Sequence, residues 1–312
     1  MSTPAVRLWH GRAAGSYRRS MIRSIVVGVD GSSGSREAVD WAALEAQRRG
    51  QALHIVHAWL SPLVETSVVP VLGVRGGTAL RTEATKVVTE AAAQAATVAP
   101  DIAVETSLVP GDAAAALIAA AGEADLLVVG HQGTGGLAGL LAGSVAVAAV
   151  SHAACQVVVV RGQYEAARHV LVGVDASSAS LHTIDAAFAA AWRSSVGVVA
   201  MHAYQITPQH RDFAERVAET SGTLTALRDH LVAAEQDAKH LVEKQVAAAR
   251  QRYPEVRVEI RVVDGQAAQE LVRASTGASL VVVGKSRRAA LRAGSMSHTL
   301  VHHAHCPVLV DR

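Results

Sequence analysis

Short, nearly continuous runs of Val, Ile, Leu and Ala recur along the chain, and longer stretches of helical character separate them. Runs without polar alternation are typical of strands buried on both faces of a parallel sheet. Strands are predicted near 24–29, 53–59, 103–108, 126–130 and 156–160, and again near 169–174, 197–203, 256–263, 280–284 and 307–311. Strands that alternate with helices imply a parallel α/β sheet with right-handed crossovers.

The ends of two predicted helices are marked by capping residues. Ser35 or a neighbouring serine can cap the first helix, which runs toward Arg49 and stops at Gly50. Asp112 can cap an Ala-rich helix that ends at Gly122. These signals place one helix after the first strand and another after the third.

The chain repeats itself. Ile25-Val-Val-Gly-Val-Asp30 recurs as Val170-Leu-Val-Gly-Val-Asp175, 145 residues later. Leu126-Leu-Val-Val-Gly130 and Gly143-Ser144 recur as Leu280-Val-Val-Val-Gly284 and Gly294-Ser295, at offsets of 154 and 151. Matched segments in one order indicate a duplication, and 312 residues suit two domains. We predict domains at 23–161 and 169–312, a linker at 162–168, and a basic, disordered tail at 1–22.

Composition narrows the possible functions. The 29 basic and 27 acidic residues are too balanced for a general polyanion binder, and 3% aromatic residues offer few stacking faces, so no nucleic acid partner is expected. Two cysteines cannot form a disulfide framework, which favours the cytoplasm. Residues 134–160 lack charge over a bilayer-spanning length, but glycines interrupt them, so a loop, helix and strand are favoured over a membrane span.

The candidate chemistry lies at the carboxyl ends of the predicted strands, where open parallel sheets bind ligands. In the first copy these ends hold Gly28-Val29-Asp30, His57-Ala58 and Val129-Gly130. Gly130 also opens the pattern Gly-x2-Gly-x9-Gly-Ser, which ends at Gly143-Ser144. Glycines let backbone amides approach an anion and adopt positive φ, and a helix start adds unpaired N–H groups. The pattern favours a phosphate site, with a flexible surface loop as the alternative.

Together, the repeat, the opening VVGVDGS, the segment GHQG-x9-GS and the endings SHAACQVVVV and HHAHCPVLV resemble the universal stress protein family. The resemblance covers about residues 23–312, and the glycine pattern is similar to the family's ATP-binding motif. It implies two tandem Rossmann-like (adenine nucleotide alpha hydrolase-like) domains, each a five-stranded parallel sheet in the order 3-2-1-4-5. It further implies ATP as ligand, with or without Mg²⁺, a nucleotide-dependent role in the stress response, pairing of the two domains within the chain, and a homodimer.

The resemblance assigns nucleotide-binding residues by position in the first copy. These are Gly28, Val29, Asp30, Ala58, Val129, Gly130, Gln132, Gly133, Gly143, Ser144 and Val145. Asp30 and Ala58 would line the adenosine part of the pocket, and the segment 143–145 would hold the phosphates. The ribose and phosphate side would be lined by Val129, Gly130, Gln132 and Gly133.

The second copy departs from this pattern. Arg287 stands where the second glycine belongs, and the loop to Gly294-Ser295 is three residues shorter. Asp175, Gly284 and Ser295 remain in place, while Lys285, Arg287, Arg288 and Arg292 attract phosphate. We predict a strong site in the first copy and a weaker second site at Asp175, Gly284, Arg287, Gly294 and Ser295. The alternative is a second site that uses side-chain cations in place of glycines.

Other interpretations stay open. No nucleophile, base and orienting group converge, so an enzymatic role is limited to slow ATP hydrolysis or self-phosphorylation. The fifth strands, Gln156–Val160 and Pro307–Asp311, are candidate sheet edges, which makes a nucleotide-independent dimeric scaffold a further alternative. A histidine cluster at 298–305 lacks the spacing of a standard zinc site, and the favoured role of His57 and His202 is structural.

Overall fold

The computed structural model describes residues 24–59, 74–133, 142–162, 169–175, 177, 180–204, 224–285 and 295–312. The first half, 24–162, contains β1 (Ser24–Gly28), α1 (Ser33–Arg49), β2 (Ala52–Trp59), α2 (Val74–Val98), β3 (Val104–Pro110), α3 (Ala113–Ala120), β4 (Leu126–Gly130), α4 (Ser144–His152) and β5 (Gln156–Val160). The second half, 169–312, contains β6 (His169–Gly173), α5 (Ser180–Arg193), β7 (Val198–Tyr204), α7 (Leu224–Arg252), β8 (Val258–Asp264), α8 (Ala267–Ser275), β9 (Ala278–Gly284), α9 (Met296–His303) and β10 (Val308–Asp311). The predicted strands are confirmed, with small shifts at their ends.

Across the described residues the strands form one sheet in the order β3-β2-β1-β4-β5-β10-β9-β6-β7-β8. Each half keeps the expected order 3-2-1-4-5 with parallel neighbours. The detail that differs is that the halves share a single ten-stranded sheet, because β5 pairs with β10 in antiparallel fashion. The two copies therefore pair within the chain, as the resemblance implied.

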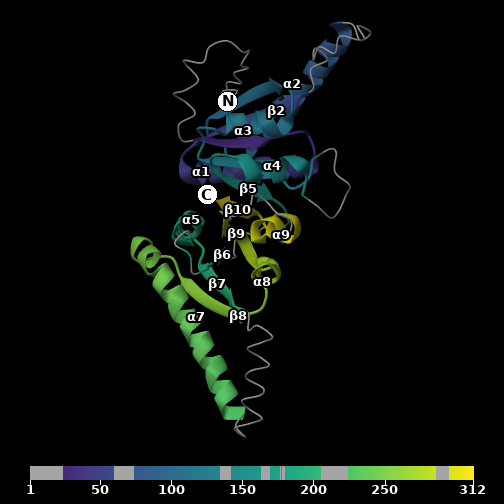
Figure 1. Cartoon of the computed structure of the whole chain (residues 1–312). Helices are drawn as coiled ribbons and strands as arrows, with labels where there is room; N and C mark the ends of the chain where they lie inside the picture. The colour runs from purple at the N-terminus through teal and green to yellow at the C-terminus, as the bar shows by residue number, and fades with distance from the viewer. Residues whose placement is uncertain are drawn as a thin grey trace.

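This pairing confirms the expected association of the two domains, and it runs through the fifth strand of each copy. Both fifth strands are interior, since β5 lies between β4 and β10, and β10 lies between β5 and β9. The outer strands of the sheet are β3 and β8, near the far ends of the molecule, where α2 and α7 also extend (Figure 1). The backbone groups of Gln156–Val160 and Val308–Asp311 are thus paired within the chain and are not available as edges to a second chain.

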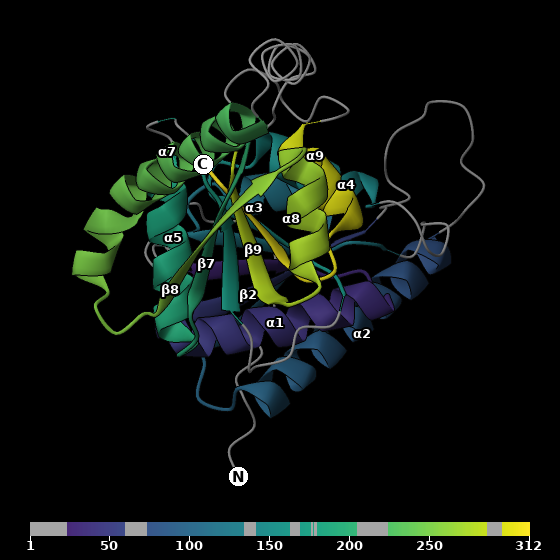
Figure 2. The same cartoon turned by 90° about the horizontal axis from the view of Figure 1, so that it is seen from below.

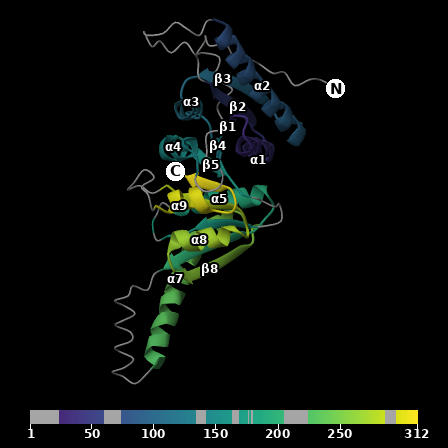
Figure 3. The ribbon, with the colours of Figure 1, turned by 90° about the vertical axis from the view of Figure 1, so that its right-hand side faces the viewer.

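Helices cover both faces of the sheet. Side chains of α1, α2, α5 and α7 pack with one face, and those of α3, α4, α8 and α9 pack with the other. Figure 3 separates the two layers in the first half, with α3 and α4 on one side and α1 and α2 on the other, and Figure 2 shows α8 beside α9. Strand residues such as Val27, Leu127 and Val282 have no exposed surface, which explains their unbroken hydrophobic runs.

Local capping agrees with the sequence, which allowed Ser35 or a neighbouring serine as the cap of the first helix. The cap of α1 is Ser32, whose Oγ accepts a hydrogen bond from the Ser35 amide at 3.1 Å. Gly50 ends α1 in the left-handed region at φ 63°, and Asp112 caps α3 by accepting from the Ala115 amide at 2.8 Å. Ser195, 145 residues after Gly50, takes a similar φ of 55° without being a glycine. The copies thus share a backbone turn that only one of them fills with the favoured residue.

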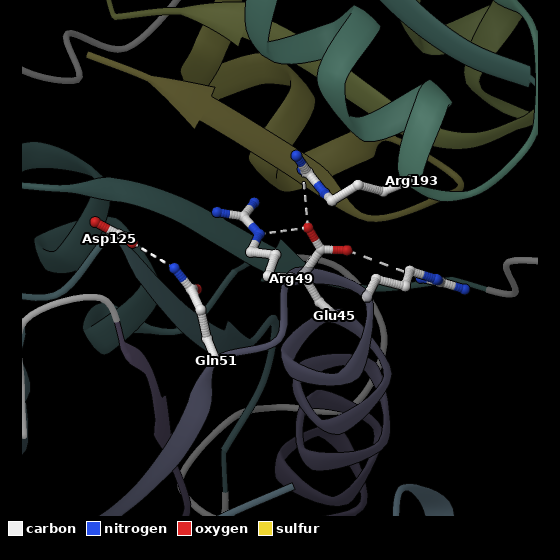
Figure 4. Close-up of polar contacts among 6 residues, drawn as sticks. Glu45, Arg49, Gln51, Asp125 and Arg193 are labelled. Carbon is white, nitrogen blue, oxygen red and sulfur yellow. Dashed lines mark hydrogen bonds and ion pairs between the residues drawn. The ribbon is translucent and has the colours of Figure 1, made fainter. Parts of the chain in front are cut away.

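A buried ion-pair network links the halves on the α1 and α5 side. The Glu45 carboxylate, only 4% exposed, accepts from Arg49 Nε at 2.6 Å and from Arg193 Nη2 at 3.0 Å. Figure 4 shows Arg193 reaching from α5 toward Glu45 on α1. Burial lowers the pKa of Arg193, and the nearby Glu45 charge opposes that effect. Arg48 Nη1 lies 3.8 Å from the other Glu45 oxygen. One carboxylate therefore pairs with three guanidinium groups at the seam between the two halves.

The charge-free stretch 134–160 forms, where it is described, α4 and β5. Among the helices of the described ranges, none combines the length and the apolar character needed to cross a bilayer.

Candidate functional site

A cavity of about 470 Å³ opens at the carboxyl ends of β1, β2 and β4. It lies where the chain order reverses, because β1 sits between β2 and β4. All eleven residues assigned from the sequence in the first copy line this first cavity: Gly28, Val29, Asp30, Ala58, Val129, Gly130, Gln132, Gly133, Gly143, Ser144 and Val145. The structure brings these residues together, and their role as ligand contacts stays a prediction.

Six further residues line the first cavity, and the sequence reasoning did not assign them to it. They are Ser35, Val56, His57, Ala113, Leu117 and Ala146. Leu117 also packs against β1, where a side chain at Gly28 would approach its Cδ1 at 2.5 Å. His57 and Val56 lie within β2 and the others lie on helices, and none of the six belongs to the glycine motif.

The glycines of the motif serve close approach rather than an unusual backbone. A side chain at Gly130 would come within 2.6 Å of the Gly34 backbone, and one at Gly133 would come within 2.4 Å of the Asp30 carboxylate. Neither Gly130 nor Gly133 is among the positive-φ glycines of the described residues, and Gly143 has φ −65°. The expectation of positive φ is therefore wrong for these three glycines. The first two are glycine because neighbouring groups pack directly on their Cα atoms.

Gly143 has a different reason for lacking a side chain. A Cβ there would meet only ordinary contacts, the nearest being His131 O at 3.7 Å, so packing within the protein does not require glycine. Gly143 is the N-cap of α4 without a side-chain cap, and its own N–H donates to His131 O at 2.7 Å. The start of α4 is thus left open to the first cavity with its backbone amides uncovered.

The polar groups of the first cavity are neutral or acidic. No Lys or Arg side chain of the described residues lines it. His57 Nδ1 lies 2.6 Å from Val29 O, which ties the imidazole to β1. Burial lowers the pKa of His131, the residue after Gly130, and the charge of Arg161 adds to the shift. An anion here would therefore be held by helix amides and the Ser144 hydroxyl, because the described residues place no cationic side chain in the cavity lining.

A second cavity of about 630 Å³ occupies the same place in the second half. Asp175, Gly284 and Ser295 line it as predicted, together with Lys285, whereas Arg287 and Gly294 lie outside the described residues. The Lys285 ammonium donates to Ser151 O at 2.7 Å, in the last turn of α4. Lys285 thus lines the second cavity, whereas His131, at the matching position of the first half, is not among the described residues that line the first cavity. The lysine already contacts the other half.

Asp175 is held by its own loop. Its Oδ1 accepts from Ser177 N at 2.8 Å, Ser177 Oγ at 2.6 Å and Ser180 Oγ at 2.5 Å. Partial burial opposes ionisation, but these hydrogen bonds outweigh it and lower the pKa of Asp175. The carboxylate is therefore ionised and largely satisfied before any ligand arrives.

The histidines near the C-terminus form a contact with the first half. The His298 and His302 rings lie 4.2 Å apart, and His302 Nδ1 accepts from the Ala142 amide at 2.9 Å. Within the described residues, no group of three or more His, Cys, Asp or Glu side chains is placed to hold a metal ion. Cys306, in contrast to half-buried Cys155, is fully buried, and burial raises the pKa of its thiol to about 12.

The fold and its paired cavities define a tandem Rossmann-like α/β protein with one candidate ligand site in each half. Comparison with known proteins adds the family. The model of the universal stress protein family matches residues 21–161 and 166–312, and the chain belongs to that family.

Two relatives and one solved structure illustrate the similarity. The chain is 36% identical over 303 residues to Universal stress protein Rv2623 of Mycobacterium tuberculosis, covering 92% of this chain and 96% of that protein. It is 31% identical over 306 residues to a universal stress protein of Mycolicibacterium smegmatis, with 92% and 96% covered. The crystal structure of a universal stress protein from Archaeoglobus fulgidus aligns with a TM-score of 0.65 at 16% identity, covering 94% and 99%. That last similarity supports the fold alone.

Proposed function

We propose that this universal stress protein binds ATP in the first cavity and acts as a nucleotide-dependent regulator in the cytoplasmic stress response. The observation that carries the proposal is the convergence of all eleven motif residues, drawn from three strand ends and one helix start, on one cavity. Its volume of about 470 Å³ lies within the usual range for small-molecule sites.

The two ends of the first cavity suit the two ends of a nucleotide. Val56, Ala58 and Leu117 supply apolar surface for a base. At the other end, Gly143 and Ser144 present the start of α4, which favours a phosphate anion through its amides and dipole. The Ser144 hydroxyl has no hydrogen-bond partner within the part of the chain that the structure describes, and it is exposed toward solvent. ATP is expected with or without Mg²⁺.

Nucleotide content of the purified protein tests the proposal directly. The protein is purified without added nucleotide and denatured, and released adenine nucleotides are quantified by chromatography and mass spectrometry. About one ATP per chain is the expected result. Two per chain would mean that the second cavity binds as well, and mostly ADP would favour hydrolysis. No nucleotide, combined with no heat of binding on titration with Mg-ATP, would contradict the proposal.

A glycine variant then assigns the site. Gly143→Leu should weaken Mg-ATP binding by about a hundredfold, because the side chain covers the amides at the start of α4. Gly277→Leu is the matched control, since Gly277 also has ordinary neighbours at 3.6 Å or more and lies outside the first cavity. Equal affinity in the two variants, with normal unfolding curves, would refute the site assignment.

A homodimer also belongs to this proposal. Because β5 and β10 are already paired, the strand edges that the described residues leave open to a second chain are those of β3 and β8. Light scattering after size-exclusion chromatography gives the mass, and a species of 32.4 kDa would count against the dimer.

A further inference from the structure

Helix α9 connects the two cavities. Its N-cap, Ser295, and its first residues, Met296 and Ser297, line the second cavity. Near its other end, His302 accepts a hydrogen bond from the Ala142 amide of the first half at 2.9 Å, across 160 residues of sequence. His302 is only 7% exposed, so this contact is shielded from solvent. One short helix thus begins at one candidate site and ends on the border of the other.

The contacted amide lies directly before the proposed anion site. Ala142 precedes Gly143, and Gly143 in turn donates to His131 O at 2.7 Å. Two successive amides are therefore held by hydrogen bonds: that of Ala142 by the second half and that of Gly143 by the first half. The amides that follow, at Ser144 and Val145, are those that line the first cavity. Anion binding by amides needs placement within about 0.5 Å, so whatever fixes residue 142 also sets the geometry of the site.

We propose that His302 is a positioning residue for the first cavity: its neutral imidazole holds the backbone that leads into α4 and thereby makes ATP affinity depend on pH. This inference rests on the ATP site proposed above. It goes further by giving the second half a part in that site, although none of its described residues lines the first cavity.

The pH dependence follows from the direction of the hydrogen bond. A backbone N–H can only donate, so His302 Nδ1 has to carry a lone pair, and a protonated ring would place a donor against a donor. Burial lowers the pKa of His302, and the charges of His298, His303 and Arg161 add to the shift. The neutral acceptor is therefore the form present at pH 7.5, and the contact is lost as the pH falls below the ordinary histidine value.

Groups on the other elements around α9 have partners of their own. On α8, Arg273 donates to Glu270 at 2.7 Å. Asp311 of β10 accepts from Gln156 Nε2 at 2.8 Å, and Arg161 Nη1 donates to Val301 O at 2.6 Å. The charges that act on the His302 ring are cationic, and each of them favours the neutral imidazole.

Two variants of His302 distinguish the effect of the hydrogen-bond acceptor from the effect of side-chain volume. His302→Asn keeps an acceptor oxygen near the position of Nδ1 and cannot titrate, while His302→Leu keeps the bulk and removes the acceptor. His303→Leu is the matched control, because His303 is the next residue on α9 and is exposed. Unfolding curves are recorded for each variant, so that a general loss of structure is recognised.

The first measurement needs no nucleotide. Amide hydrogen exchange at Ala142 in the full-length protein at pH 7.5 should be about tenfold faster in His302→Leu than in wild type, in His302→Asn or in His303→Leu. Unchanged exchange in His302→Leu would overturn the proposal whether or not ATP binds. This readout also distinguishes failure of the inference from failure of the ATP site.

The second measurement is the Mg-ATP dissociation constant by calorimetry between pH 7.5 and pH 5. At pH 7.5, His302→Leu should bind about tenfold more weakly than wild type, and His302→Asn should stay within about twofold. Between pH 7.5 and 5, the wild type should lose about tenfold more affinity than His302→Asn. Parallel pH profiles of wild type and His302→Asn would overturn the pH dependence. Absence of ATP binding in every protein would refute the proposed function, leaving the exchange result to decide the contact.

Discussion

The two cavities share a framework and differ in what fills it. In both halves a histidine at the end of the second strand, His57 or His202, bonds to the carbonyl that follows the first strand. The serine hydroxyls diverge: Ser35 donates to the Ser32 carbonyl, whereas Ser180 donates to the Asp175 carboxylate. The strand ends thus place a cavity at the same position in both halves. A few polar side chains determine its charge and which of its polar groups already have hydrogen-bond partners.

Cations mark the other difference between the halves. The first cavity has no Lys or Arg among its described lining, and the second has Lys285. Burial lowers the pKa of Lys285, with Arg312 adding to the effect, and its ammonium is committed to Ser151 O. A phosphate in the second cavity would therefore compete with a contact that joins the halves, which is consistent with the prediction of a weaker second site.

Buried His54 offers the largest test of the comparison, because Val199 stands at the matching position of the second half. His54 Nε2 lies 2.8 Å from Ser107 Oγ, and burial lowers the pKa of His54 to about 4. In the unfolded chain the His54 imidazole is protonated near pH 6.5, but in the folded chain only near pH 4. The free energy of unfolding is therefore unaffected by His54 above pH 6.5 and decreases as the pH falls from 6.5 toward 4. The total loss is about 3 kcal/mol.

The matched variant is His54→Val with Ser107→Ala, which removes the titrating group and its hydroxyl partner together. Urea unfolding at pH 7.5 and pH 4.5 should show a smaller loss of free energy on acidification than in wild type, by about 2 to 3 kcal/mol. Equal losses in both proteins would show that His54 is not the source.

The glycines after β4 and β9 give the second test. Gly130→Ala should lower the free energy of unfolding by about 2 to 3 kcal/mol, because the new methyl group would meet the Gly34 backbone at 2.6 Å. At the matching position, Gly284→Ala meets only Thr183 Oγ1 at 3.0 Å, a side chain that can move, and should cost under about 1 kcal/mol. Chemical denaturation of the pair checks the difference, and similar costs would count against close packing at Gly130.

The seam network supplies the third test. Glu45→Ala installs the residue that the second half has at the matching position, Ala190. It leaves Arg193 and Arg49 without their carboxylate, and we expect a loss of about 2 kcal/mol in the free energy of unfolding. Adding Arg193→Leu should restore part of it, since an unpaired guanidinium is then removed from the seam. A double variant less stable than Glu45→Ala would contradict this explanation.

The smallest expected effect concerns the turn after α1 and α5. Ser195→Gly should stabilise the protein by about 0.5 to 1 kcal/mol, because glycine takes a φ of 55° without strain. The reverse change, Gly50→Ser, should destabilise it by a similar amount. Thermal unfolding should give a higher midpoint temperature for Ser195→Gly and a lower one for Gly50→Ser. Changes in the same direction for both variants would refute the comparison.

Much of the fold and of the first cavity could be predicted from the sequence. Uninterrupted runs such as Leu126–Gly130 indicated buried strands, and strand ends in a parallel sheet meet at one edge, which gathers Asp30, Ala58 and Gly130. Contacts between distant segments had no local signal: the approach of Gly34 to Gly130 and the bond from Ala142 to His302 depend on packing geometry. The motif glycines were expected at positive φ, whereas Gly130 and Gly133 are required by close contacts with Gly34 and Asp30.

The antiparallel pairing of β5 with β10 makes the association of the copies intramolecular. β5 ends at Val160 and β6 begins at His169, so a short connection keeps the partners at a high effective concentration. Dilution therefore leaves this seam intact, unlike the interface between two separate chains. In a symmetric interface between two identical chains, one substitution changes both sides. Here a substitution changes only one side of the seam, so each side can change independently of the other. Glu45 on one side and Ala190 on the other show that the two sides of this seam differ.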